Sequence, residues 1–195
     1  MTARPQEKNK MTPAEYLAME RSSLNIKHEF FNGEMFAMVG AKINHIRINA
    51  NLTGELRNIF KGNKSTCEVL PNDMRVKIED GYVYPDIVIS CGDAEFEDNE
   101  FDTLTNPVVI MEILSDSTEA FDRGKKFAYY RATPTLQEYI LVSQDEYHVE
   151  QFIRCDHGKW EYCSYKGIDQ TLKVASVNCE LPLSEIYWDI KFELK

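Results

Sequence analysis

The chain lacks a long hydrophobic run and lacks cysteines spaced for zinc. No apolar stretch approaches the roughly 18 residues of a membrane span, and residues 1–10 are polar and of mixed charge, which argues against a signal peptide. The five cysteines are widely spaced and include no Cys-x-x-Cys pair, so zinc binding is disfavoured and reduced thiols in a cytoplasm are favoured. We therefore expect a cytoplasmic protein with no membrane partner.

Basic charge is also in short supply. The formal net charge is −10, from 22 Lys and Arg against 32 Asp and Glu, whereas phosphate binding requires clustered Lys and Arg. The charge is segregated, because residues 41–78 carry seven basic and three acidic side chains, while residues 79–102 carry nine acidic and no basic ones. The negative net charge argues against a nucleic-acid enzyme, although the basic residues within 41–78 could still form a local basic face.

The length and composition indicate one globular domain. The chain has 195 residues, of which 43 % are hydrophobic and 28 % charged, and a chain of this size buries about 70 % of its unfolded surface. No internal repeat or linker interrupts it. We expect residues 1–10 to form a disordered tail and residues 11–195 to form a single domain.

Periodicity and turn signals predict alternating helices and strands. Thr12 followed by Pro13 and Glu15 is typical of a helix start, and Asn32-Gly33 is the strongest short-range hairpin signal. Predicted helices cover residues 13–20, 44–60 and 118–132, the last opened by an Asp116-x-x-Glu119 capping box. Predicted strands cover 28–31, 34–38, one strand over 67–70 and 74–78 interrupted near Pro71, then 84–90, 108–114, 138–143, 148–154 and 160–165.

This order predicts an α/β (α+β) fold, a mixed sheet with helices on both faces. Residues 108–114 are almost continuously apolar and β-branched, as in a central strand buried on both faces. The connection from this strand to residues 138–143 passes through a helix, so the two strands should be parallel. We expect residues 92–106 to form a solvated acidic loop, and residues after 183 a short helix or extended piece.

Two acidic residues interrupt these apolar strands. Asp86 follows Pro85 at the start of one strand, and Glu112 lies inside the 108–114 run. A buried carboxylate is costly unless it is paired. Asp86 could instead cap a turn, and Glu112 could pair with a buried Arg or Lys. If their strands are neighbours, the two carboxylates converge and suit Mg²⁺ or Mn²⁺, with waters and a substrate phosphate completing the coordination.

A lysine near such a metal would favour phosphodiester hydrolysis. The ion polarises the phosphoryl group and activates water, and an ammonium group stabilises the charged transition state. Lys125 and Lys126 lie on the helix that follows Glu112. The alternative is an exposed helix ion pair, because Asp122 and Lys126 are four residues apart.

Several segments, in order along the chain, match one family pattern: His28-Glu29 with Asn32-Gly33-Glu34, Pro85-Asp86, Glu112-Ile-Leu-Ser-Asp-Ser-Thr118, Asp122-Arg-Gly-Lys-Lys126 and Pro134-Thr-Leu-Gln-Glu-Tyr139. Through these segments the chain resembles the Uma-two family, a branch of the restriction-endonuclease-like PD-(D/E)xK superfamily, over most of residues 11–154. The resemblance implies that Asp86 and Glu112 are metal ligands and that the catalytic lysine has moved from the strand, where Leu114 stands, to Lys126. It also raises Glu34 and His45 as further site members, although each could be an ordinary hairpin-end or helix-end residue.

These observations predict a Mg²⁺- or Mn²⁺-dependent endonuclease acting on DNA. A non-catalytic nuclease fold, kept as an interaction or oligomerisation module, is the alternative that the acidic charge favours. Hydrolysis of a small phosphoester is a third possibility. A homodimer is expected by analogy with nucleases that cut two strands, with the strand-rich C-terminal part offering an edge. No helix-turn-helix or zinc module for reading bases is apparent.

Overall fold

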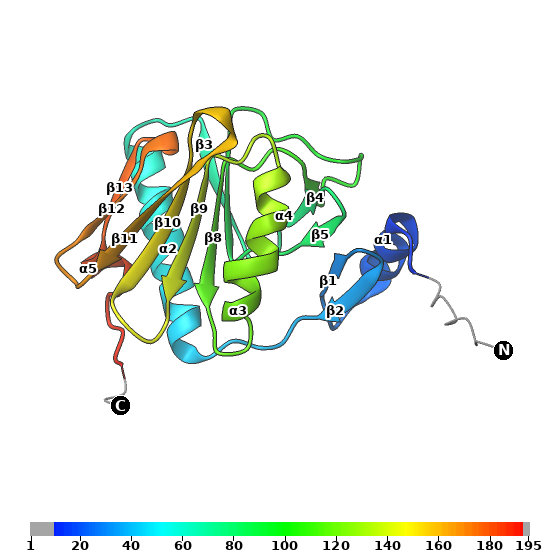
Figure 1. Cartoon of the computed structure of the whole chain (residues 1–195), viewed down its shortest axis with the longest axis horizontal. Helices are drawn as coiled ribbons and strands as arrows, with labels where there is room; N and C mark the ends of the chain where they lie inside the picture. The colour runs from blue at the N-terminus through cyan, green and yellow to red at the C-terminus, as the bar shows by residue number, and fades with distance from the viewer. Residues whose placement is uncertain (1–9, 193–195) are drawn as a thin grey trace.

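A six-stranded mixed sheet forms the centre of the protein in the computed structural model, which describes residues 10–192 (Figure 1). The strand order is β11-β10-β9-β8-β6-β3. β8 and β9 are parallel, as predicted, and the other neighbours are antiparallel. The predicted tail falls, apart from Lys10, outside the described residues. The strands are β3 (Cys67–Pro71), β6 (Ile87–Cys91), β8 (Val109–Leu114), β9 (Glu138–Ser143), β10 (His148–Arg154) and β11 (Trp160–Lys166).

Helices cover both faces of this sheet. The amphipathic helix α2 (Ile43–Gly62) packs on one face, and its apolar side joins the largest core cluster. A helical segment comprising α3 (Glu119–Phe121), a π-helical turn (Asp122–Lys126) and α4 (Phe127–Ala132) lies on the opposite side (Figure 1). In β8, alternate side chains point toward α2 or toward α4, so all six are buried. Helix α4 buries Phe127 and Tyr130 in the core.

A second sheet lies beside the first, with the order β2-β1-β5-β4-β7. The hairpin turns at Asn32-Gly33 as predicted, and α1 (Pro13–Ser22) begins with the predicted capping box of Thr12 and Glu15. The prediction of one interrupted strand over residues 67–78 is wrong, because β3 and β4 belong to different sheets. The strands are β1 (His28–Phe31), β2 (Glu34–Ala37), β4 (Arg75–Ile78), β5 (Gly81–Val83) and β7 (Thr103–Leu104).

The acidic segment 92–106 is not the structureless, solvated loop that its composition predicts. It contains the buried strand β7, which pairs with β4. Its acids also meet basic residues from distant parts of the chain: Arg21 lies 2.8 Å from both Asp98 and Asp102, and the buried Arg75 lies 2.6 Å from Asp102. These ion pairs fasten α1 and β4 to the segment.

The helix after β8 starts differently from the prediction. Thr118, not Asp116, occupies the N-cap position and makes no capping hydrogen bond through its side chain, so the predicted capping box is absent. Asp116 lies instead 2.8 Å from Lys42 at the start of α2. The π-helical turn inside this segment adds one residue to a turn, a distortion that is frequent at functional sites.

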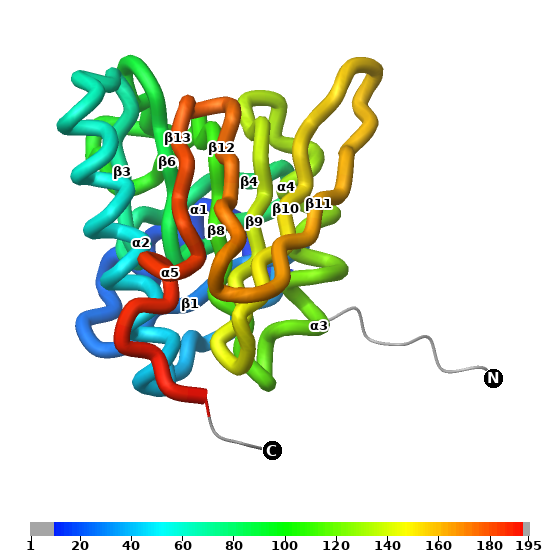
Figure 2. Tube along the Cα trace, turned by 90° about the vertical axis from the view of Figure 1, so that its left-hand side faces the viewer, coloured from blue at the N-terminus to red at the C-terminus, as the bar shows by residue number. Residues whose placement is uncertain are grey.

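The C-terminal part forms a hairpin that the sequence patterns did not predict, followed by a short helix at the position where a short helix or extended piece was expected. β12 (Thr171–Val174) pairs with β13 (Cys179–Pro182), and α5 (Leu183–Ile186) follows directly. These elements cover the same face of the main sheet as α2, as Figure 2 shows, and contribute to the same core cluster. No helix in the described range combines the length and apolarity that crossing a membrane requires.

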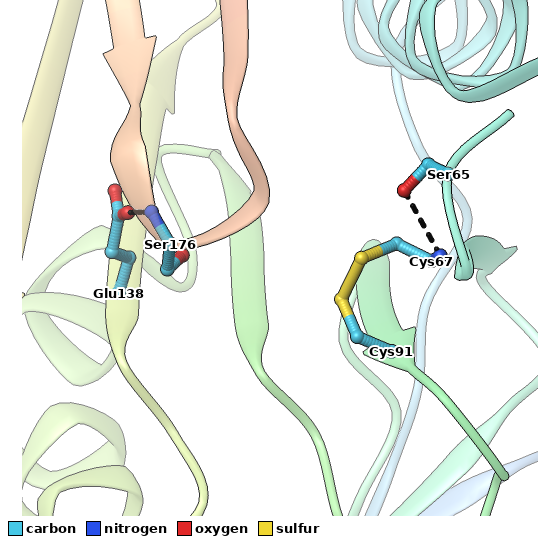
Figure 3. The surroundings of a disulfide bond; sticks show 5 residues. All are labelled: Ser65, Cys67, Cys91, Glu138 and Ser176. Atoms are coloured by element: carbon cyan, nitrogen blue, oxygen red, sulfur yellow. Dashed lines mark hydrogen bonds between the residues drawn. A yellow bond between two sulfur atoms is a disulfide. The ribbon is translucent and has the colours of Figure 1, made fainter. Parts of the chain in front are cut away.

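A disulfide joins Cys67 of β3 to Cys91 of β6, at positions that pair across the two strands (Figure 3). The expectation that all five cysteines are reduced thiols is therefore wrong for this pair. Its members are 24 residues apart, and only the tertiary pairing of the strands brings them together. Cys155, Cys163 and Cys179 are free thiols.

Candidate active site

The alternation of side chains along β6 and β8 brings Asp86 and Glu112 together. Ile87 pairs with Met111 in the antiparallel register, and one further step places Asp86 opposite Glu112. The Asp86 amide points at Glu112 Oε2 (3.4 Å), and the Ile113 amide donates to Asp86 Oδ2 at 2.7 Å. Glu112 is buried and Asp86 is half-buried, so both acids face a common space at one end of the sheet.

Lys126 is the cationic member of this group. Its Nζ lies 2.9 Å from Glu112 Oε1, 3.1 Å from Glu29 Oε1 and 3.7 Å from Asp122 Oδ1. Its side chain is only 7 % exposed, so the alternative of an exposed helix ion pair with Asp122 is wrong. Lys125, the preceding residue, is exposed. The π-helical turn thus presents Asp122 and Lys126 to the carboxylates of the sheet.

Glu29 belongs to the group, although the sequence pointed to Glu34. Both lie on the β1–β2 hairpin and share one face of it, but Glu29 is the one that meets Lys126 and accepts a hydrogen bond from the Tyr84 amide at 3.1 Å. Glu34 is exposed near the turn and does not line the cleft around Asp86. The period-two spacing of Glu29 and Phe31 places Glu29 on the face of the buried Phe31, but because Glu34 shares that face, spacing alone does not distinguish the two acids.

His45 supports Asp86 from the first turn of α2. Its Nε2 lies 2.8 Å from Asp86 Oδ1. One turn further along, Asn49 donates to the Asp86 carbonyl at 3.1 Å and to the Asn72 side chain at 2.7 Å. These contacts fix the start of β6 and the orientation of its carboxylate. The structure thus brings together Asp86, Glu112, Lys126 and His45, and does not bring Glu34 to them.

The electrostatics of the site are dominated by burial and by a surplus of acids. Burial raises the pKa of Glu112 to about 8, against the opposing pull of Lys126. Burial likewise raises the pKa of Asp122. For Lys126, burial alone would lower the pKa, but Glu112, Glu29 and Asp122 together raise it well above its usual value, so the ammonium is retained.

The oxygens of Glu112 have different surroundings. Oε1 lies beside Lys126 and accepts a hydrogen bond from the hydroxyl of Tyr130 at 2.8 Å. Burial keeps the pKa of Tyr130 well above its usual value, so its phenol remains a donor. Oε2 faces Asp86 and has only the long contact to its amide. It is therefore the Glu112 atom best placed to bind an additional ligand.

A cleft of about 880 Å³ opens onto this group. Its floor carries Asp86, Glu112 and Lys126, and its walls come from β1, β2, the start of α2 and the segment after β8. Much of the wall is apolar, with Phe36 and Met38 from the hairpin side. The site is therefore a concave, solvent-accessible space with a few convergent polar groups, as ligand sites typically are.

The donor set fits a magnesium-type ion more closely than a protein-only metal cage. Within residues 10–192, no group of three or more His, Cys, Asp or Glu side chains is arranged to hold a metal. Mg²⁺ commonly uses only one or two carboxylates and completes its coordination with waters and substrate phosphates. Asp86 and Glu112 supply two such carboxylates, and the four acids around Lys126 and His45 leave a negative balance that attracts a cation.

The fold is restriction-endonuclease-like. It is similar to the crystal structure of "a putative nuclease belonging to DUF820" from Anabaena variabilis, with a TM-score of 0.76 at 16 % sequence identity over 91 % of this chain and 97 % of that one. At this identity the likeness shows the fold.

The chain belongs to the Uma2 family, described as "Putative restriction endonuclease", whose model matches residues 13–184. Two uncharacterized proteins of Synechocystis are also similar. The protein slr1290 is 33 % identical over 185 residues, covering 94 % of each chain, and sll1609 is 38 % identical over 152 residues, covering 77 % of this chain and 84 % of that one. The family and the fold agree with the predicted resemblance.

Proposed function

We propose that the protein is a Mg²⁺- or Mn²⁺-dependent endonuclease that hydrolyses phosphodiester bonds in DNA. The observation that carries the proposal is the convergence of Asp86, Glu112 and the Lys126 ammonium at the floor of an open cleft. Membership of the family described as "Putative restriction endonuclease" supports the same class of reaction.

Asp86 would hold the ion through its carboxylate, and Glu112 would hold it through Oε2. When bound, the ion supplies Lewis-acid activation of the phosphate and of the attacking water. His45 and the Ile113 amide orient the Asp86 carboxylate, and Tyr130 fixes Glu112. Preorganised ligands of this kind need no rearrangement when charge develops in the transition state.

Lys126 acts as a fixed positive charge. Its raised pKa argues against a role as general base, because a base must release its proton near the working pH. An ammonium held by three acids can instead orient the water and stabilise negative charge on the phosphoryl oxygens. Glu29 and Asp122 are positioning residues that hold Lys126.

The direct test is cleavage of supercoiled plasmid DNA by purified protein with Mg²⁺ or Mn²⁺. We expect nicking or cutting that EDTA stops, and loss of at least about 100-fold in rate for Asp86→Ala, the range in which loss of a key transition-state interaction falls. Lys125→Ala is the matched control on an exposed neighbour of the site and should retain the rate. Equal cutting by Asp86→Ala would assign the activity to a contaminant.

The alternative, a non-catalytic nuclease fold, is favoured by one observation. The cleft is rich in acids, and each of its three lysines, Lys27, Lys42 and Lys126, already meets a carboxylate. Such a surface binds phosphate poorly without a metal. This alternative predicts that Mn²⁺ neither stabilises the protein nor promotes its binding to DNA, whereas a bound ion must raise stability by mass action.

A further inference from the structure

The exposed apolar side chains of this protein are concentrated in one place. Of the eleven large hydrophobic residues that are exposed in the described part of the chain, seven lie between residues 24 and 46. Large exposed apolar patches typically mark protein–protein contacts or ligand grooves. Four of them line the cleft and form what we call its apolar rim: Phe36, Met38, Val39 and Ile46.

Strand β2, which carries part of this rim, is the end strand of its sheet (Figure 1). After Glu34 its remaining residues are uncharged, and the uncharged run continues to Ala41. Proteins normally protect an edge strand with charges, a bulge or a covering segment, since an apolar edge pairs with another strand. On β2 these protections are missing beyond Glu34.

The other edge strands among residues 10–192 are protected. β11 exposes Glu161 and Lys166, and β3 exposes Glu68 and is bridged to β6 by the disulfide. β7 is two residues long and buried. In the small C-terminal sheet, Lys173 and Glu180 are exposed and lie 3.4 Å apart. The contrast singles out β2 and argues against the C-terminal edge that the sequence suggested for a dimer.

The charges that flank the uncharged run point to a second copy of the same segment. Glu34 precedes the run and Lys42, which also contacts Asp116, follows it. In an antiparallel pairing about a two-fold axis near Met38, Glu34 of each copy faces Lys42 of the other. A parallel pairing would place like charges opposite one another. A two-fold contact uses the same patch on both copies, and this segment is complementary to itself.

A nucleic-acid strand fits the rim less well. Surfaces that bind single strands combine aromatic platforms with a track of positive charge. The rim is mainly aliphatic, with Phe36 as its one ring, and the cleft beside it is acidic.

We propose that the protein forms a homodimer by antiparallel pairing of residues 34–42 with the same segment of a second copy, so that β2 of each copy lies against residues 39–42 of the other and the apolar rim is covered. The inference does not rest on the chemistry of the cleft, and its test measures mass alone. Sedimentation equilibrium of the whole chain should give a dimer at micromolar concentration. Ala37→Lys places a charge on the exposed edge strand and should weaken association by roughly tenfold or more. Tyr162→Lys, on the exposed β11 edge, is the matched control and should leave the dimer intact.

Charge reversal tests the register. Glu34→Lys should weaken the dimer, and adding Lys42→Glu should restore it, because the opposite charges are then exchanged. If Ala37→Lys fails to fold, Val39→Lys serves, since this side chain is 78 % exposed and lies beyond the strand. A wild-type protein that is monomeric at about 100 µM would overturn the proposal. So would a dimer that survives both lysine substitutions on the rim or is lost with Tyr162→Lys.

Discussion

Two buried carboxylates lie on neighbouring parallel strands, Glu112 on β8 and Glu138 on β9, and they are stabilised by different kinds of partner. Glu138 is 0 % exposed and accepts hydrogen bonds from the Gln151 side chain and from the Ser176 amide, the latter at 2.7 Å (Figure 3). These partners are neutral and are held by the fold. Glu112 instead meets the charged Lys126 at the floor of a cleft.

The difference separates a structural acid from a candidate ligand. A carboxylate that receives hydrogen bonds from fixed neutral donors has its needs met without a further ligand. The group of Glu112, Asp86, Glu29 and Asp122 contains more negative charge than Lys126 offsets, and it opens to solvent. Burial depth alone therefore does not identify the functional acid. The balance of charge around the acid and the access of solvent to it identify the functional acid.

Removal of the Lys126 ammonium group from among these acids should have the largest effect on stability. Lys126→Met leaves Glu112, Glu29 and Asp122 facing one another, and breaking a buried pair typically costs about 3–5 kcal/mol. We expect a loss of this size in urea unfolding, partly restored by Mn²⁺. Lys125→Met, one residue away and exposed, should change stability by less than about 0.5 kcal/mol. Equal effects of the two substitutions would show that the acids do not depend on Lys126.

Glu112→Gln and Glu138→Gln should have different effects on activity, because Glu112 is a proposed metal ligand and Glu138 is a structural residue. The first removes a proposed metal ligand, so plasmid cleavage should fall by roughly 100- to 1,000-fold, equivalent to about 3–4 kcal/mol in the barrier. The second should leave the rate within about twofold of wild type, because Glu138 lies outside the cleft. Initial rates of nicking at saturating Mg²⁺ measure both. A comparable loss of cleavage rate in Glu138→Gln would contradict the distinction between a metal-binding Glu112 and a structural Glu138.

The stability of these variants should show the reverse order. In Glu138→Gln, an amide group that donates hydrogen bonds faces the Gln151 and Ser176 donors, and an unsatisfied buried polar group costs about 1–3 kcal/mol. Burial keeps the Glu112 carboxyl largely protonated at neutral pH, because it raises the pKa to about 8. Glu112→Gln therefore exchanges one neutral group for another, and its cost should be smaller. Thermal unfolding at neutral pH decides the order. A more severe loss in Glu112→Gln would mean that Glu112 is mainly a structural partner of Lys126.

The pH dependence of metal binding is a smaller effect that follows from the raised pKa of Glu112. Below the pKa of the unfolded chain, both states hold the proton. As pH rises toward about 8, the unfolded chain has released it while the folded protein still retains it, so metal-free stability falls through this window. A metal must displace the same proton. The rise in melting temperature caused by Mn²⁺ should therefore grow between about pH 6 and pH 8, and a pH-independent rise would contradict the role of Glu112.

Local signals in the sequence account for much of this architecture. The Asn32-Gly33 turn, the apolar spacing along α2 and the continuous apolar run of β8 each specify an element through contacts within a few residues. The two proposed ligands were visible for the same reason, as Asp86 and Glu112 interrupt strands in which a carboxylate is expensive.

The features that the sequence did not predict depend on distant contacts. Ion pairs with Arg21 and Arg75 make the acidic segment 92–106 an ordered part of the fold. No local sequence pattern predicts these ion pairs. The disulfide between Cys67 and Cys91 requires the pairing of β3 with β6. The inclusion of Glu29, and not Glu34, depends on how the hairpin is placed over Lys126, which is a property of the tertiary structure.

The most direct measurement is a Mn²⁺ titration followed by thermal unfolding of the wild type, Glu112→Gln and Glu138→Gln. Binding to the native state alone at 100 times the Kd stabilises by about 2.7 kcal/mol. We expect such a rise for the wild type and Glu138→Gln and little or none for Glu112→Gln. An unchanged response in Glu112→Gln, or its loss in Glu138→Gln instead, would contradict the assignment of the cleft acids as the metal site.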